Sequence, residues 1–494
     1  MLVRAKAAGY ASTLARRLLP VCGPRIFHGS LIFWTLRYLW VKGEQTSEFS
    51  FATGGLKGGS CSLAFVTAHA LAQAVEMATT VMAVAGIGYF LAALVAAWVY
   101  LASRRALVVA CPQFSPGVSI LKSLKGLDPG MMDAFRSHCR QRYSGEFELL
   151  FGVSSLTDPA AAAVELLKDE FPGSTIRLIE CPERLGTNGK VSTLVQLAAH
   201  ARFDFLLIND SDVTVSPRYL ERVMMCFAPE ATAAEPKAAG DSAGAAPGVK
   251  GGAGSSQPVG LVTALYRGRS HGPVFSHGGL GSRLEALGIA TDFMPGVLLS
   301  RLVERGLHYG LGATLAVRRE ALEKAGGFLS LVDHLADDYE MGARVAQAGY
   351  RVALAPEVVE TAVPAYGWRG FVDHQLRWAR TVRDARPGGY AGLIVTHGLV
   401  WAVTNVLASG LSPVSLWLLA LSFFLRLALA MTAGAEVLSD HQVLPMLWLL
   451  PVRDLVGLGL WAAGWAGNTI VWRGEMFVLQ QGKLEKVPER PSDA

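Results

Sequence analysis

Residues 205–212 read Phe205-Leu206-Leu207-Ile208-Asn209-Asp210-Ser211-Asp212, an apolar run followed by two carboxylates. Four consecutive apolar residues that end in polar ones are typical of a strand buried on both faces. The run therefore places Asp210 and Asp212 at the tip of a strand, where parallel sheets bind their ligands. Hard divalent cations such as Mg²⁺ or Mn²⁺ take one or two carboxylates, substrate phosphates and waters. We predict that Asp210 and Asp212 are metal ligands, holding an ion that neutralises a leaving diphosphate.

The same alternation of strand and helix surrounds this run from Pro116 to about Arg386 and predicts an α/β domain with a mostly parallel sheet. The expected strands are Val118–Leu121, Glu148–Val153, Thr175–Ile179, Phe205–Ile208 and Gly260–Ala264. The expected helices are Leu166–Phe171, Val191–Ala199 and Pro217–Cys226. Residues 229–258 are dominated by Ala, Gly, Pro and Ser, which predicts a disordered surface insertion.

Composition indicates a membrane protein with a substantial soluble part, because 51% of the 494 residues are apolar and only 17% are charged. A net charge of +5 and the lack of any nucleic-acid motif argue against a nucleic-acid partner. The six cysteines form no Cys-x-x-Cys pair, so we expect reduced thiols in a protein that faces the cytosol.

The apolar stretch Thr80–Ala102 contains no charge and is long enough to span a bilayer as a helix. Arg104 and Arg105 follow it, and basic residues favour the cytoplasmic side. We therefore expect a transmembrane helix at 79–103, a cytosolic domain at 104–388, a C-terminal membrane region at 389–473 and a cytoplasmic tail at 474–494. Within the membrane region the span candidates are Tyr390–Leu411, Val414–Met431 and Val443–Trp472, the last interrupted near Pro451. Residues 1–78 are a poorly defined extension.

A second acidic cluster, Asp337-Asp338, lies at what reads as a helix start. Two adjacent, partly buried carboxylates raise each other's pKa, which suits a general base that takes a proton from an acceptor hydroxyl. Acidic residues are also favoured at helix N-termini for their charge alone, so the residues by themselves leave both interpretations open.

A third element is His374-Gln375-Leu376-Arg377-Trp378. On a helix, His374, Arg377 and Trp378 share one face. Arg377 can clamp a diphosphate oxygen, and Trp378 can stack on an acceptor or leaving group. The arginines that follow at three-residue spacing are typical of a helix on the membrane surface, where they contact anionic lipid.

Other polar residues follow the remaining strands. Lys122 ends the first strand, Asp158 follows the second, and Asn188 and Lys190 flank a glycine turn. We expect these four residues to bind the substrate, with Lys190 supplying positive charge to a phosphate.

With these residues assembled, the chain resembles the ceramide glucosyltransferase family and its bacterial relatives in hopanoid-lipid glycosylation, from about Thr80 to Phe477. Asp158 matches the first aspartate motif of the family, Asp210 the second and Asp338 the third. Arg377 and Trp378 match its Arg-Trp motif. Further matching blocks are residues 116–126 (Pro-Gly-Val-Ser-Ile-Leu-Lys-Ser-Leu-Lys-Gly) and 472–474 (Trp-Arg-Gly).

The resemblance implies a GT-A fold, inversion at the anomeric carbon and Asp338 as the catalytic base, with Arg377 and Trp378 completing the catalytic set. Asp337 and His374 join the substrate-binding residues. His374 stands where the family usually has Gln or Arg, and Ser155 where relatives often have another Asp.

The expected activity is transfer of a sugar, with glucose preferred, from a UDP-sugar to a membrane lipid such as ceramide. The alternatives are N-acetylglucosamine transfer to a hopanoid polyol, a processive polysaccharide synthase, and a membrane scaffold or transporter with a degenerate transferase-like domain.

Overall fold

The computed structural model describes residues 59–110, 113–229, 257–270, 279–472 and 475–486. Within them lies a seven-stranded sheet of order β3-β2-β1-β4-β6-β5-β7. β6 is antiparallel to both of its neighbours, and the other adjacent pairs are parallel. In sheet order the strands are β3 (Ile176–Glu180), β2 (Phe147–Val153), β1 (Val118–Ser123), β4 (Phe205–Ile208), β6 (Leu315–Arg318), β5 (Val259–Ser270) and β7 (Arg351–Val363). The predicted, mostly parallel α/β sheet is thus confirmed.

The register places the ends of several strands at one edge of the sheet. Leu121 in β1 pairs with Ile208 in β4, so the carboxyl ends of these parallel strands coincide. Ile208 also pairs with Leu315, the first residue of the antiparallel strand β6. The chain that leaves β4 at Asn209 and the chain that enters β6 therefore meet at this edge.

Helices cover both faces of the sheet because its strands alternate their side chains between two buried cores. Ile120 and Leu207 face the core that contains the helices α4 (Met131–Cys139), α5 (Pro159–Glu170) and α7 (Tyr219–Met224). Leu121 and Leu206 face the other core, built with α6 (Gly189–His200), α10 (Arg319–Lys324) and α11 (Asp337–Gln347). The predicted insertion is almost wholly outside the described residues.

Five helical stretches in the described part of the chain are long and apolar enough to cross a membrane: His69–Ala110, Gly279–Val303, Pro387–Ala408, Pro413–Val437 and Val443–Gly464. The first belongs to α3 (Gly59–Ala110), which starts well before the expected Thr80. The second was not expected, because charged residues interrupt its sequence; it joins α8 (Gly279–Gly288), the π-helical turn η3 (Ile289–Phe293) and α9 (Met294–Val303).

The other three stretches correspond to the three C-terminal apolar blocks. They contain α13 (Pro387–Gly392), η5 (Leu393–His397), α14 (Gly398–Ala408), α15 (Pro413–Ala430), η6 (Met431–Val437), α16 (Val443–Met446), η7 (Leu447–Leu449) and α17 (Leu450–Gly464). The interruption expected near Pro451 is present: the 3-10 turn η7 separates α16 from α17, and Pro451 lies in the first turn of α17.

A buried ion-pair network joins these apolar helices. Arg426 of α15 donates to Asp454 of α17 at 2.7 Å and to Asp292 of η3 at 2.6 Å. Asp292 also accepts from Arg453 of α17 at 2.8 Å. A charge in such an apolar segment is tolerated when it is paired inside the protein. This pairing explains how the predicted span 414–431 accommodates Arg426.

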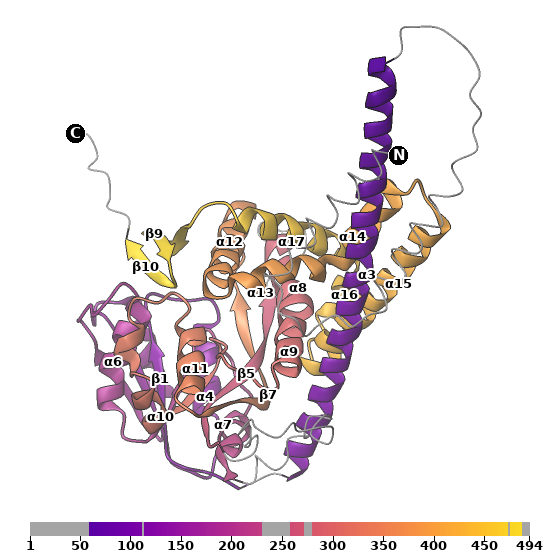
Figure 1. Ribbon diagram of the computed structural model, residues 1–494. Helices are drawn as coiled ribbons and strands as arrows, with labels where there is room; N and C mark the ends of the chain where they lie inside the picture. The colour runs from indigo at the N-terminus through magenta and orange to yellow at the C-terminus, as the bar shows by residue number, and fades with distance from the viewer. Residues whose placement is uncertain (1–58, 111–112, 230–256, 271–278, 473–474, 487–494) are drawn as a thin grey trace, which may run out of the picture. The chain divides into compact units, whose positions relative to one another are not determined.

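The C-terminal strands form a separate three-stranded sheet of order β10-β9-β8, made of β8 (Thr469–Trp472), β9 (Glu475–Gln480) and β10 (Lys483–Lys486). They lie beside α12 (Trp368–Ala385), the helix that carries the Arg-Trp motif (Figure 1). Residues 475–486 of the expected tail are therefore folded against the rest of the protein.

Candidate active site

Asp210 lies two residues beyond the end of β4, and its carboxylate forms an ion pair with Lys190. Lys190 Nζ is 2.7 Å from Asp210 Oδ1 and 3.6 Å from Asp337 Oδ2, and the Asp210 side chain remains 45% exposed. Burial alone disfavours the charged amine, but Asp210 and Asp337 outweigh it and raise the pKa of Lys190. Lys190 therefore links Asp210 to Asp337, while part of the Asp210 side chain remains exposed to solvent.

Lys122 lies beneath this ion pair, at the carboxyl end of β1. Its side chain is fully buried, and Nζ donates to the backbone oxygen of Asp210 at 3.0 Å. Burial lowers the pKa of Lys122 to about 7, against the opposing influence of Asp212 and Asp210. The amine thus holds the chain at the tip of β4 and lies close to the acidic pair.

The buried side chain of Asn209 fixes the end of β4 by hydrogen bonds. Its amide donates to the Ala313 carbonyl at 2.7 Å and to Tyr219 Oη at 2.9 Å, while its oxygen lies 3.1 Å from His138 Nε2. These buried contacts tie β4 to the entry of β6 and to α4, and they fix the backbone from which Asp210 projects.

Asp212 is held differently from Asp210. Its Oδ2 accepts a hydrogen bond from Thr361 Oγ1 and one from the Ala362 N–H at 3.0 Å, both in β7. Burial, followed by the nearby charge of Asp210, raises the pKa of Asp212. Between the two carboxylates, Ser211 donates to Asp128. Asp212 thus has one oxygen bound to the sheet, whereas Asp210 is the more open carboxylate.

Asp337 and Asp338 begin α11, so the predicted helix start is confirmed. Burial, followed by the charge of Asp337, raises the pKa of Asp338 to about 6, while Lys190 opposes the shift. Asp338 Oδ1 accepts from the Tyr339 N–H at 2.8 Å. Asp337 Oδ2 is buried, and no described residue donates a hydrogen bond to it.

Two glycines allow the chain before β6 to lie directly against Asp338. A Cβ at Gly312 would come within 2.9 Å of Asp338 Oδ2, and a Cβ at Gly310 within 2.8 Å of the Asp338 carbonyl oxygen. The Gly310-Leu311-Gly312 sequence is thus a close-approach site that the sequence analysis missed. The available signal was a Gly-x-Gly sequence directly before the short apolar run 313–317, which was not predicted as a strand.

Asp158 and Asn188 have local bonding partners that define their positions. Asp158 caps α5 by accepting from the Ala160 N–H at 2.9 Å and also accepts from the Gly126 N–H at 2.9 Å. Asn188 is fully buried; it caps α6 and donates to the His334 carbonyl at 2.8 Å. These contacts fix two loops at the carboxyl edge of the sheet, and the expected substrate contacts of both residues stay predictions.

His374 lies in a second polar cluster rather than with the carboxylates at the strand tip. Its Nδ1 is 3.0 Å from Glu285 Oε2 and 3.0 Å from Tyr366 Oη. Gln375 donates to the same Glu285 oxygen at 3.2 Å, and Tyr366 also donates to it. Glu285 belongs to the unexpected apolar helix α8, which is why sequence reasoning did not identify it.

Trp378 lies in a row of aromatic side chains between the two clusters. Ring centroids are 5.2 Å apart for His374 and Trp378, 6.4 Å for Trp378 and Phe293, and 6.0 Å for Phe293 and Tyr266. Burial, followed by the charges of Asp338, Glu285 and Asp210, raises the pKa of Tyr266. Tyr266 therefore lies within electrostatic reach of both clusters.

Arg377 acts on Tyr366, which belongs to the cluster around Glu285. Burial and Glu285 raise the pKa of Tyr366, and the positive charge of Arg377 opposes that rise. Beyond it, Arg380 Nη2 donates to the Ala466 carbonyl at 2.8 Å and Arg383 Nη1 to the Gly464 carbonyl at 2.6 Å. Arg386 forms an ion pair with Glu304 at 2.7 Å. These outer arginines bind protein groups, a role that their helical spacing did not indicate.

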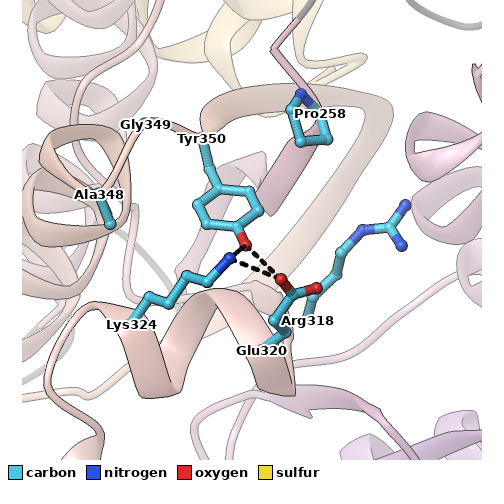
Figure 2. A pocket seen from close by; sticks show the side chains of 7 residues that line it. All are labelled: Pro258, Arg318, Glu320, Lys324, Ala348, Gly349 and Tyr350. Carbon is cyan, nitrogen blue, oxygen red and sulfur yellow. Dashed lines mark hydrogen bonds and ion pairs between the residues drawn. The ribbon is translucent and has the colours of Figure 1, made fainter.

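A surface pocket of about 380 Å³ lies away from these residues, between Arg318, Glu320, Lys324 and Tyr350 (Figure 2). Arg318 pairs with Phe205 at the start of β4, whereas Asp210 follows the end of β4. The pocket is therefore at the opposite edge of the sheet from the acidic cluster. Within it, Glu320 accepts from Lys324 at 2.7 Å and from Tyr350 at 3.1 Å.

Comparison with known proteins identifies the family. The model of glycosyl transferase family 21 matches residues 78–236 and 253–485. Ceramide glucosyltransferase 3 of Caenorhabditis elegans is 22% identical over 389 residues, which cover 74% of this chain and 73% of the relative. Ceramide glucosyltransferase 1 of the same organism is 23% identical and covers 76% of each chain.

Among solved structures, a mannosyltransferase from Pyrobaculum calidifontis in complex with GDP-mannose and Mn²⁺ has a TM-score of 0.44 at 20% identity and covers 80% of this chain and 97% of that one. The seven-stranded, mostly parallel sheet with helices on both faces has the α/β architecture that the sequence predicted. The chain therefore belongs to glycosyltransferase family 21, the family of sugar transferases that includes the ceramide glucosyltransferases.

Proposed function

We propose that this glycosyltransferase moves a sugar, glucose in our assignment, from a UDP-sugar to a hydroxyl of a membrane lipid with inversion at the anomeric carbon. The observation that carries the proposal is the pair of contacts made by Lys190, which holds Asp210 and Asp337 together at the carboxyl edge of the sheet. The ceramide glucosyltransferase relatives support the choice of sugar and of a lipid acceptor.

The donor diphosphate binds at Asp210 together with Mg²⁺ or Mn²⁺. The donor set fits an ion that arrives with its substrate. Asp210 is half-exposed and Asp212 has one carboxylate oxygen free of β7, while the described residues contain no group of three His, Cys, Asp or Glu arranged around a metal. Mg²⁺ sites of this kind use one or two carboxylates and complete their shell with phosphates and waters. When bound, the ion supplies positive charge to the departing diphosphate.

Basic residues complete the donor site. Lys190 faces Asp210 and carries its full charge, since its pKa is raised. Lys122 has a pKa near 7, and a bound phosphate would favour its charged form. Arg377 then adds a charge on the leaving-group side. Asp158 and Asn188 support the loops against which we place the nucleotide.

Asp338 is the base in this proposal. Its pKa of about 6 leaves it ionised at neutral pH yet basic enough to accept a proton. The acceptor oxygen forms its bond to the anomeric carbon while the bond from that carbon to the diphosphate breaks. UDP leaves with the bonding electrons, and the hydroxyl proton passes to Asp338.

The acceptor reaches Asp338 from the membrane. Five described stretches are long and apolar enough to cross a bilayer. In one of them the ring of Phe293 lies against Tyr266, whose pKa is raised by burial and by the charge of Asp338. Arg104 and Arg105 favour a cytoplasmic catalytic domain.

The test uses the purified full chain with UDP-glucose, Mg²⁺ or Mn²⁺, and ceramide in detergent. We expect metal-dependent release of UDP with one hexose added to each lipid. Hydrolysis of the donor without a glycosylated lipid would contradict the acceptor assignment. A hexose polymer would favour a processive synthase. Transfer only from UDP-N-acetylglucosamine, or only to a hopanoid polyol, would change the assigned donor or acceptor but not the proposed reaction type.

A further inference from the structure

The C-terminal sheet β8–β10 contacts the residues that immediately precede Asp337. The turn between β9 and β10 has two residues with positive φ, Gln481 at 51° and Gly482 at 79°, as tight hairpins require. At this turn the Gly482 carbonyl accepts from the Leu335 N–H at 3.2 Å, and the Leu484 N–H donates to the Asp333 carbonyl at 2.8 Å. The hairpin is thus hydrogen-bonded to the backbone of 333–335.

Apolar packing reinforces these hydrogen bonds. Leu335 is buried in a small core that is separate from the two cores of the main sheet. The other members of this core all come from the C-terminal sheet: Ile470, Phe477, Leu479 and Leu484. Leu335 is two residues before Asp337, so the packing holds the entry to α11.

The opposite side of the same segment contacts the loop that leads to Lys190. Asp333 Oδ1 accepts from the Thr187 N–H at 2.9 Å and from Thr187 Oγ1 at 3.0 Å. Asn188 donates to the His334 carbonyl and caps α6, in which Lys190 is the second residue. The segment 333–335 therefore lies between the C-terminal hairpin and the Lys190 loop.

The hairpin also contacts α12. The Gly482 N–H donates to the Asp384 carboxylate, and Arg380 donates to the Thr469 carbonyl in β8. Arg383 Nη2 adds a bond of 2.6 Å to Asn468 Oδ1, just before β8. Asp384 is two helical turns beyond Arg377, so one hairpin turn bonds to both the Asp338 side and the Arg377 side of the site.

We propose that the C-terminal sheet is a clasp that positions Asp338 and Lys190 relative to Arg377 and Trp378. Gly482 and Asp384 are positioning residues in this view, since they act through the segment 333–335 and through α12. The inference rests on the proposed roles of Asp338 and Arg377. It assigns to the last strands a part in the chemistry, in addition to any contribution to stability.

The primary variant is Gly482→Val, because a β-branched side chain is strongly disfavoured at a φ of 79°. Asp384→Asn is a milder variant that keeps the shape and weakens the bond from Gly482, and it serves if the first fails to fold. Glu485→Gln is the matched control, since it changes an exposed side chain of β10 in the same hairpin. All are made in the full chain and purified in detergent.

Two measurements separate the clasp from the proposed function. Hydrogen exchange followed by mass spectrometry reports on the clasp alone: we expect faster exchange at 333–338 and 380–384 in both variants, and no change in Glu485→Gln. Steady-state kinetics report on positioning: we expect kcat to fall about tenfold in Gly482→Val while KM for the UDP-sugar changes less than about threefold, a loss confined to the transition state.

A shift in the acid limb of the pH profile should accompany the loss in kcat, because the surroundings of Asp338 set its pKa. Unchanged exchange at 333–338 would overturn the clasp whatever the activity. Faster exchange with unaltered kcat and pH profile would reduce the sheet to a stabilising element. Absence of any transfer by the unsubstituted chain would instead count against the proposed function, and the exchange result would still stand.

Discussion

Two regions of this protein pair carboxylates with basic side chains. They differ in how far the charged groups are buried and in how many of them have hydrogen-bond partners. In the network among the apolar helices, Arg426 and Asp454 are 2% and 4% exposed, and Arg426 donates to two carboxylates and to Thr291. In the cluster at the sheet edge, Asp210 is 45% exposed beside its lysine, and Asp337 Oδ2 lies 3.6 Å from Lys190 Nζ without a hydrogen bond from the described residues. Saturated pairing indicates structure, whereas incomplete pairing at a strand tip indicates a place for a ligand.

The largest effect on turnover is expected from Asp338→Asn. The amide keeps the shape but cannot take a proton, so we expect kcat to fall by about 10²–10⁴. Binding of the UDP-sugar, measured by calorimetry with Mn²⁺ present, should stay within a few-fold. Equal loss of binding and turnover would assign Asp338 to the donor site and remove its role as base.

Removing one partner in the other region should damage stability rather than chemistry. Arg426→Met leaves the buried Asp454 without its cation, whereas Asp292 keeps Arg453, and removing one partner of a buried ion pair costs about 3–5 kcal/mol. Thermal unfolding in detergent should show a clear loss, while kcat per folded molecule stays near that of the unsubstituted chain. The double variant Arg426→Met with Asp454→Leu should recover part of the loss. A fall in kcat at unchanged stability would contradict a purely structural role for the ion-pair network.

Lys190→Met addresses the cluster at the sheet edge from its basic side. Without the lysine, Asp210 and Asp337 lose the charge that opposes their repulsion, and the pKa of Asp338 should rise above about 6. The acid limb of the kcat profile should therefore move to higher pH, and donor affinity should fall about tenfold through the lost phosphate contact. An unchanged acid limb would show that Lys190 does not influence the pKa of Asp338.

The unsubstituted chain makes a simpler prediction about pH. Asp338 must be ionised to act as a base, and its raised pKa means that protonation begins well above the range of an ordinary aspartate. Activity should therefore be lost as pH falls through about 6 and be retained at neutral pH. A profile that stays flat down to pH 4.5 would contradict the raised pKa or the base role.

The smallest effect is expected at His374. Its ring contacts Glu285 and Tyr366 and not the aspartates at the sheet edge. His374→Gln retains hydrogen bonding and should therefore change kcat less than about fivefold. Steady-state kinetics of sugar transfer measure this change. A loss as large as that of Asp338→Asn would place His374 in the chemistry.

Local patterns in the sequence were sufficient for five of the seven strands, for the strand tip at Asp210 and for the helix start at Asp337, because each depends on a few neighbouring residues. The strands β6 and β7 were not predicted. Contacts between distant segments could not be read in this way. The bond from Thr361 to Asp212 spans 149 residues, and that from Gly482 to Asp384 spans 98. Glu285 was missed for a related reason: charged residues in α8 and η3 obscured an apolar helix whose charges are paired only in the folded protein.

The carboxylates at the tip of β4 and the start of α11 are, in this interpretation, the centre of sugar transfer to a lipid. The most direct test is mass spectrometry of lipids from matched cells that express equal amounts of the unsubstituted chain or of Asp338→Asn. We predict a lipid heavier by one hexose in the first cells and its absence in the second. Identical lipid profiles in the two, with both proteins folded and in the membrane, would contradict the assignment.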